Sequence, residues 1–219
     1  ILGVNGVGKS TLLKCINRIL GRHSGKIAVL GEDTRRLGGN ELAQRIGYVA
    51  QSQSFSSSTV FDAVLLGRKP YIKWDVTEED LRIVRTVLHS LGLDDFALRR
   101  LDELSGGERQ KVVIARALAQ QAEVLLFDEP TSNLDLKNQL ELIAIIKRIV
   151  RERQISAIVT MHDLNLALRF ADRFILLRHG EIFAVGGAEI ISAENILAVY
   201  GVKVAVERHQ GLPVVIPVA

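Results

Sequence analysis

Cysteine is almost absent from this sequence, and long hydrophobic runs are missing. Cys15 is the only cysteine among 219 residues, which excludes an intramolecular disulfide. It falls on the apolar face of a predicted helix, so we expect a buried, unreactive thiol in a reducing compartment. No stretch approaches the roughly 18 consecutive apolar residues of a membrane-spanning helix, so we expect any role at a membrane to be peripheral.

Aromatic residues and excess charge are also scarce. Phe, Trp and Tyr make up 5% of the chain, and 28 basic against 25 acidic residues leave a net charge of only +3. Nucleic-acid-binding surfaces combine basic stripes with interleaved aromatics, whereas the densest basic cluster here, residues 147–153, is interpreted as the solvated face of a helix. We therefore expect no nucleic-acid partner. The 47% hydrophobic content suffices for a packed core of one or two domains.

A glycine-rich loop opens the chain. Residues 1–11, ILGVNGVGKST, fill every fixed position of the phosphate-binding pattern G-x-x-x-x-G-K-[ST], between a strand end and a helix expected over 10–20. Lys9 is expected to reach the outer phosphates of a nucleotide, and Ser10 to offer its hydroxyl to Mg²⁺. The other residues expected to bind the nucleotide are Asn5, Gly6, Val7, Gly8 and Thr11. The loop alone leaves open a kinase, a GTPase, a helicase or a transporter motor.

A second helix start is also typical of an anion site. Ser105 and Glu108 have the spacing of a capping box at the beginning of a helix. Gly106 and Gly107 lie between them, although glycine is a poor helix former. Because these glycines leave the positive end of the helix without side chains, we predict that it binds a phosphate.

Polar side chains follow three predicted strands. The apolar strand at 124–127 ends in Asp128 and Glu129. We expect it to lie beside the P-loop strand, so that Asp128 reaches Mg²⁺ and Glu129 polarises an attacking water. Gln51 follows a strand at 45–50 and His162 follows a strand at 155–160. The carboxyl ends of parallel strands meet at one sheet edge, where ligands bind. Taken singly, adjacent acids can be helix caps, and a glutamine or histidine at a strand end is often structural.

Residues 59–104 carry helix signals and no strand pattern. Capping boxes begin at Thr59 and Thr77, and apolar residues recur at helical spacing after the second of them. We expect a helical subdomain inserted into an α/β core, with further core-packing helices as the alternative. Downstream, the sequence predicts a β-hairpin over 173–185, a helix over 190–200 and strands over 202–219.

These motifs, in this order, resemble those of the nucleotide-binding subunit of an ATP-binding cassette (ABC) transporter. The resemblance identifies Walker A at 3–10, the Q-loop at Gln51, the signature at 104–108, the Walker B strand at 124–128, the catalytic glutamate at Glu129, the D-loop at 132–135 and the switch histidine at His162. It implies an α/β fold of the P-loop NTPase (RecA-like) type, with a parallel-sheet core. One domain is expected over 1–219, with the helical subdomain at 59–104.

The resemblance also implies an activity and partners. We expect an ATPase in which Glu129 is the base, His162 and Gln51 position water and the γ-phosphate, and Mg²⁺ is held by Ser10, Gln51 and Asp128. Two copies are expected to pack head to tail, so that ATP on one Walker A is covered by the other copy's signature and D-loop. The nucleotide contacts expected there are Ser105, Gly106, Gly107 and Asp135. Permease subunits are expected to dock near the helical subdomain, at the cytoplasmic face of the membrane.

A narrower resemblance rests on residues 59–68, 161–167 and 200–202. These stretches are similar to subunits that drive uptake of iron-siderophore, haem or vitamin B12 compounds; the alternative is a soluble ABC-type ATPase that serves as a scaffold or assembly factor without a permease. Val4 stands where the family usually has proline. The family also has two strands and an adenine-stacking aromatic before Walker A, so we expect an upstream segment here and expect adenine binding to depend on it.

Overall fold

Both helices and strands are present throughout the chain in the computed structural model, which describes residues 1–21, 24–51, 58–132 and 134–218. The helices are α1 (Lys9–Ile16), α2 (Gly39–Arg45), α3 (Val60–Leu65), α4 (Glu78–Ser90), α5 (Gly106–Ala119), α6 (Leu136–Arg153), α7 (Leu164–Phe170) and α8 (Ala193–Tyr200). The strands are β1 (Ala28–Val29), β2 (Glu32–Asp33), β3 (Ile46–Val49), β4 (Val124–Asp128), β5 (Ser156–Thr160), β6 (Phe174–Arg178), β7 (Glu181–Gly186), β8 (Val204–His209) and β9 (Leu212–Pro217). The mixed α/β fold predicted from the sequence is confirmed.

The central sheet is parallel and runs in the order β3, β4, β5. Ile1 and Leu2 extend it: the Ile1 nitrogen donates to the Val159 carbonyl at 2.7 Å, and the Leu2 N–H donates to the Ile175 carbonyl of β6 at 2.8 Å. The expectation that β4 lies directly beside the P-loop strand is wrong, because β5 pairs with β4 along its length and lies between the two. Thr160, the last residue of β5, therefore faces Asp128 in register.

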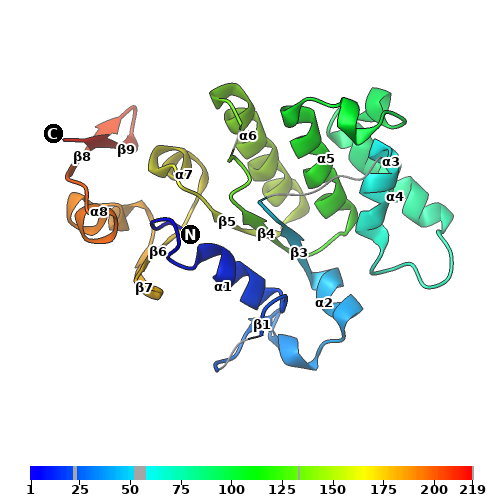
Figure 1. Cartoon of the computed structure of the whole chain (residues 1–219), viewed down its shortest axis with the longest axis horizontal. Coiled ribbons are helices and arrows are strands. Elements are labelled where there is room, and N and C mark those ends of the chain that lie inside the picture. Colours follow the sequence, from blue (N-terminus) through cyan, green and yellow to red (C-terminus); the bar gives the residue numbers. More distant parts are fainter. Residues whose placement is uncertain (22–23, 52–57, 133, 219) are drawn as a thin grey trace.

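The two faces of the sheet are covered by different helices (Figure 1). Successive strand residues point to opposite faces. Leu126 accordingly packs with Leu13 of α1 in one hydrophobic cluster, whereas Leu125 and Phe127 pack in a second cluster that includes Ile114 of α5. Burial on both faces explains why β4 is an unbroken apolar run, as parallel strands usually are.

The segment 59–104 consists of α3, α4 and 3₁₀ turns at Leu66–Arg68, Asp94–Phe96 and Leu101–Glu103. Both predicted caps are present: the Thr59 hydroxyl accepts from the Asp62 N–H, and the Thr77 hydroxyl accepts from the Asp80 N–H. These helices lie beyond α5, on the side away from α1 (Figure 1).

Two local predictions differ from the structure. The helix after the P-loop ends at Ile16 instead of residue 20, because Arg18 adopts a positive φ of 57° and its guanidinium donates to the carbonyls of Thr34 and Leu37. Helix α2 has Gly38 as its N-cap residue, and the Gly38 N–H donates to the Glu41 carboxylate at 2.7 Å. Cys15 is half-buried rather than buried.

The C-terminal elements match the predicted pattern. Strands β6 and β7 form the expected hairpin, and α8 is followed by a β8–β9 hairpin. The side chain of Asn165 on α7 binds β9 like a strand partner, with its Nδ2 donating to the Val215 carbonyl at 3.1 Å and its Oδ1 accepting from the Val215 N–H at 2.8 Å. The hairpin is thereby fixed to the helix that follows His162.

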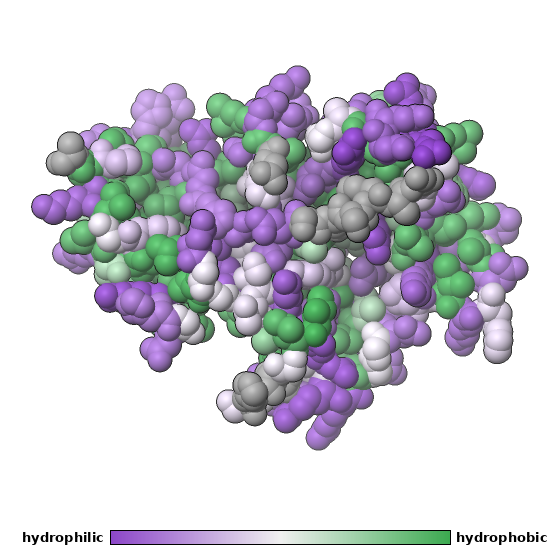
Figure 2. Space-filling view, in the orientation of Figure 1, coloured by the Kyte–Doolittle hydropathy of each residue, from purple (hydrophilic) through white to green (hydrophobic). Residues whose placement is uncertain are grey.

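The surface mixes hydrophilic and hydrophobic residues over the face shown in Figure 2. Within the described part of the chain, no helix combines the length and apolar character needed to cross a bilayer.

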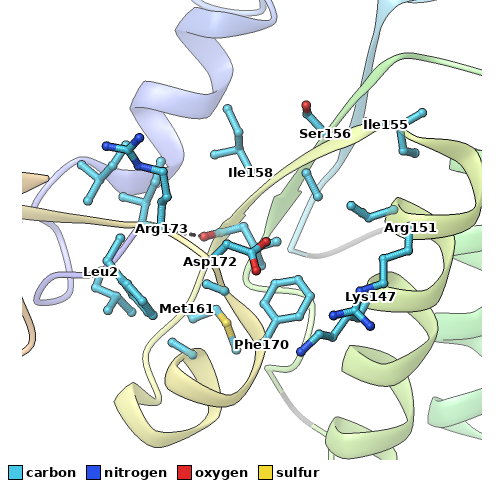
Figure 3. Close-up of a pocket in the computed structure, with 18 residues that line it drawn as sticks. Leu2, Lys147, Arg151, Ile155, Ser156, Ile158, Met161, Phe170, Asp172 and Arg173 are labelled. Carbon is cyan, nitrogen blue, oxygen red and sulfur yellow. Dashed lines mark hydrogen bonds between the residues drawn. The ribbon is translucent and has the colours of Figure 1, made fainter. Parts of the chain in front are cut away.

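A cavity of about 430 Å³ lies between β5, α6, α7 and β6. Ile158, Met161 and Phe170 lie inside it, and Lys147 and Arg151 lie on its α6 side (Figure 3). No predicted site residue is among the described residues that line this cavity.

Candidate active site

Nine of the predicted site residues line one cleft of about 340 Å³ at the carboxyl ends of the parallel strands. They are Asn5, Gly6, Gly8, Lys9, Ser10, Thr11, Gln51, Glu129 and His162. Val7 belongs to the same loop, but its side chain is buried and its N–H donates to the Val4 carbonyl at 3.3 Å. The P-loop and three strand ends that are distant in sequence therefore meet, as the sequence predicts.

Glycine is required in the loop for two different reasons. Gly8, the N-cap of α1, has φ 106°, a left-handed conformation that strains any L side chain. Gly3 makes a close approach: a Cβ there would lie 2.8 Å from the Leu177 carbonyl oxygen. No side chain caps α1, so its first N–H groups lack the partner that a cap would provide. This helix start is therefore suited to binding an anion.

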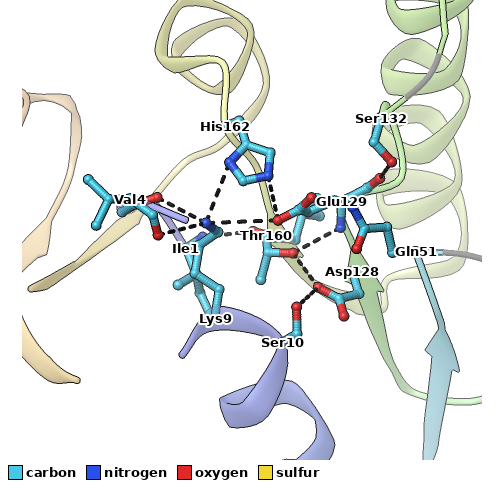
Figure 4. A network of polar contacts seen from close by, with 12 residues as sticks. Ile1, Val4, Lys9, Ser10, Gln51, Asp128, Glu129, Ser132, Thr160 and His162 are labelled. Carbon is cyan, nitrogen blue, oxygen red and sulfur yellow. Dashed lines mark hydrogen bonds and ion pairs between the residues drawn. The ribbon is translucent and has the colours of Figure 1, made fainter. Parts of the chain in front are cut away.

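Lys9 lies across the loop with its ammonium group directed inward (Figure 4). Its Nζ donates to the Gly3 carbonyl at 2.9 Å and to the Val4 carbonyl at 3.3 Å, and lies 3.8 Å from Glu129 Oε1. Burial lowers the pKa of Lys9, and the charges of Glu129 and Asp128 partly oppose that shift. The buried cation is thus held by carbonyls and acidic neighbours in the cleft.

Asp128 is surrounded by hydroxyl groups. Its Oδ1 accepts from Ser10 at 2.8 Å and from Thr160 at 2.9 Å, and its Oδ2 accepts from Tyr48 at 3.1 Å. A carboxylate beside the Ser10 hydroxyl offers the hard oxygen donors that Mg²⁺ prefers, so these two residues fit the expected ion. Among the described residues, no cluster of three His, Cys, Asp or Glu side chains could hold a metal by itself.

Glu129 has nitrogen donors around both carboxylate oxygens. His162 Nε2 lies 2.6 Å from Oε1, and Gln51 Nε2 donates to Oε2 at 2.7 Å (Figure 4). The His162 Nδ1 also lies 3.5 Å from Lys9 Nζ. Glu129 is therefore in direct contact with the other two residues predicted to be catalytic, whereas within the described part of the chain no hydrogen bond joins Gln51 to Asp128.

Two hydroxyl residues of the site, the half-buried Tyr48 and the fully buried Thr160, are absent from the sequence-based predictions. Burial and the Asp128 carboxylate raise the pKa of Tyr48. Both residues belong to strands of the central sheet, where tyrosine and threonine are common for packing reasons alone. The sequence feature that could have identified them is their position relative to the predicted site residues. Thr160 lies two residues before His162, and Tyr48 lies three residues before Gln51.

The signature residues and Asp135 do not line the cleft. Ser105 caps α5 in a capping box with Glu108, and this hydrogen bond lowers the pKa of the Glu108 carboxyl. A Cβ on Gly107 would lie 2.7 Å from Asn138 Oδ1 in the first turn of α6, which Asp135 caps. These predicted phosphate contacts thus form a second group beside α6; Asn133 of the predicted D-loop lies outside the described residues.

Comparisons with known proteins agree with this geometry. The profile of a family described as ABC transporter matches residues 1–132. An ABC transporter ATP-binding protein of Methanocaldococcus jannaschii is 57% identical over 218 residues, covering 100% of this chain and 86% of that protein. A phosphonates import ATP-binding protein of Nitratidesulfovibrio vulgaris is 40% identical, over 92% of this chain and 80% of that protein. The ferric enterobactin transport ATP-binding protein of Escherichia coli is 36% identical, over 99% of this chain and 82% of that protein.

Solved structures show the same fold. An inward-facing ABC transporter described as of metal-chelate type superposes with a TM-score of 0.87 at 30% identity, covering 100% of this chain and 86% of that chain. A dimeric ATP-binding cassette bound to ADP and Pi superposes with a TM-score of 0.72 at 30% identity, covering 85% and 83%. Together with the P-loop cleft and the family match over more than half its length, these likenesses show that the chain belongs to the ABC transporter family, as one of its ATP-binding ATPases.

Proposed function

We propose that this chain hydrolyses ATP in the cleft around Lys9 and thereby energises uptake of an iron-siderophore, haem or cobalamin-type compound. The observation that carries the ATPase part is the convergence of Lys9, Glu129 and His162 on one P-loop cleft, with Asp128 hydrogen-bonded to Ser10 of the cleft wall. The substrate class is supported by the enterobactin relative and the metal-chelate transporter, while the phosphonate relative names the competing class. Vesicles containing the chain and its permease should take up a ferric siderophore; uptake of phosphonate instead would contradict the substrate class.

In this proposal, each side chain of the cleft has its own task. Glu129 accepts the proton of the water that attacks the γ-phosphorus, as the bond to the ADP oxygen breaks. His162 and Gln51 hold its two oxygens, and so orient the carboxylate before the reaction. Lys9 balances negative charge on the phosphates. Mg²⁺ held by Ser10 and Asp128 would supply further neutralisation of the phosphate oxygens.

The partners follow from what lies outside the cleft. Ser105, Gly106, Gly107 and Asp135 need a second copy to bring them to a nucleotide, and the ADP-bound relative is a dimer. Residues 59–104 form the helical subdomain of a single domain in this proposal, and the permease docks near it. The chain is then a peripheral protein at the cytoplasmic face of the membrane.

The test of the active site is Glu129→Gln. The amide cannot accept the proton, so steady-state hydrolysis should fall by roughly 10² to 10⁴, while ATP affinity stays the same. Glu41→Gln, an identical change at an exposed helix cap, is the matched control and should keep full activity. Undiminished hydrolysis by Glu129→Gln would remove Glu129 from the role of base.

A further inference from the structure

The backbone of Glu129 adopts an unusual conformation. Its φ is 49°, in the left-handed region that residues other than glycine rarely occupy. The next residue is Pro130, and a residue before proline is normally extended. Such strained residues persist only where the surrounding structure holds them. The turn that aims the proposed base must therefore be held by specific contacts.

Hydrogen bonds fix this residue on both sides. The Glu129 N–H donates to Thr160 Oγ1 at 2.9 Å. The Glu129 carbonyl accepts from the Ser132 N–H at 3.1 Å and from the Ser132 hydroxyl at 2.9 Å. Because Asp128 and Thr160 are paired in register across β4 and β5, the threonine lies beside the turn that follows Asp128.

The Thr160 hydroxyl also touches the neighbouring carboxylate. Its proton is donated to Asp128 Oδ1 at 2.9 Å, while its lone pair accepts from Glu129. The residue is fully buried, so no water can easily replace these bonds. One hydroxyl thus links the backbone of the proposed base to the carboxylate that fits Mg²⁺.

We infer that Thr160 is a positioning residue for ATP hydrolysis, because its hydroxyl holds Glu129 in the left-handed turn that directs its carboxylate toward His162 and Gln51. This inference rests on the proposed role of Glu129 as base. Without the hydroxyl, the turn relaxes toward an extended conformation and the carboxylate shifts within the cleft. Misplacement of a catalytic group by about 1 Å can cost about 100-fold in rate.

The test uses Thr160→Val, which keeps the shape and removes the hydroxyl. We expect kcat for ATP to fall about 10- to 100-fold with KM within about twofold of wild type. Thr160→Ser keeps the hydroxyl and should recover kcat to within about threefold of wild type. A packing role alone predicts the reverse order, since valine fills the site better than serine.

Thr34→Val is the matched control. Thr34 is also fully buried, and its hydroxyl has no hydrogen-bond partner among the residues that the structure describes. The same substitution there should leave kcat unchanged. If Thr160→Val does not fold, Ser132→Ala is the second variant. It removes the hydroxyl that donates to the Glu129 carbonyl at the other end of the same turn, and Ser132 is only half-buried. It should lower kcat about twofold to fivefold with KM unchanged.

Three outcomes overturn the inference. The first is a wild-type kcat in Thr160→Val. The second is a parallel loss of kcat and ATP affinity in Thr160→Val that Thr160→Ser does not recover. The third applies if Thr160→Val does not fold, and is a wild-type kcat in Ser132→Ala. Glu129→Gln separates this failure from failure of the proposed function: if that variant is inactive while Thr160→Val is fully active, Glu129 remains the base and only the role of Thr160 falls. If Glu129→Gln is fully active, both fall.

Discussion

At the residue scale, two adjacent carboxylates have different surroundings. Asp128 is the last residue of β4 and receives three hydroxyl groups, from Ser10, Thr160 and Tyr48. Glu129 leaves the strand through a left-handed turn and meets nitrogen donors instead. A carboxylate among hydroxyls fits a hard metal ion, whereas one held by an imidazole and an amide is oriented for proton transfer.

Tyr48→Phe tests the hydroxyl groups around Asp128 through the pH dependence of the free energy of unfolding. At pH 8 the variant should be less stable by about 1.5–3 kcal/mol, because a hydrogen bond to a charged group is lost. The raised pKa means that the folded protein keeps the Tyr48 proton above pH 10, where the unfolded chain releases it. Stability of the wild type therefore falls as the pH rises past 10.

The variant has no titrating group at this position, so it escapes that loss. The stability gap between the two proteins should narrow from pH 9 to pH 11, as measured by denaturant unfolding at each pH. A gap that stays constant or widens would show that burial and Asp128 do not hold Tyr48 in its protonated form.

At the element scale, the functional residues just after strand ends were predictable, and those within the strands were not. Gln51, Glu129 and His162 could be assigned because parallel strands deliver their carboxyl ends to one edge. Thr160 could not, since a threonine in an apolar strand has an ordinary packing explanation. The order of the strands also required the structure, because local pattern does not specify which strand lies between β4 and the P-loop.

A buried ion pair ties the helical segment to α5. Arg68 Nε donates to Asp80 at 2.8 Å, its NH1 group donates to the Ala119 carbonyl, and its guanidinium lies 3.9 Å from the Tyr71 ring centroid. Burial alone would raise the pKa of Asp80, but hydrogen bonds from Thr77 and Arg68 outweigh burial and lower it. The pair thus joins three elements inside the protein.

Asp80→Asn should therefore be strongly destabilising. Removing one partner leaves the Arg68 charge buried and uncompensated, which costs about 3–5 kcal/mol. Glu79→Gln is the control on the same helical turn: its pair with Arg82 is exposed to solvent, so the substitution should change the free energy of unfolding very little. Equal unfolding free energies for the two variants would contradict a structural role for the buried pair.

At the scale of the whole molecule, one chain carries two glycine-flanked helix starts that suit phosphate. The α1 start opens into the cleft with Lys9, whereas Ser105 and Gly107 lie beside α6 and outside that cleft. A second copy in head-to-tail orientation would bring the α5 start of one chain over the P-loop of the other. Each nucleotide site in this arrangement would be shared between the two chains.

Mixing two inactive variants tests the shared site most directly. Lys9→Ala disables every P-loop in its own dimer, and Ser105→Arg fills every α5 start in its own. In a mixed dimer, one site combines both defects, and the other combines an intact Lys9 with an intact Ser105. We expect the mixture to recover ATP-dependent dimers, measured by sedimentation with differently tagged chains, that neither variant forms alone. No ATP-dependent dimer in the mixture, with exchange of tagged subunits demonstrated, would contradict the head-to-tail account.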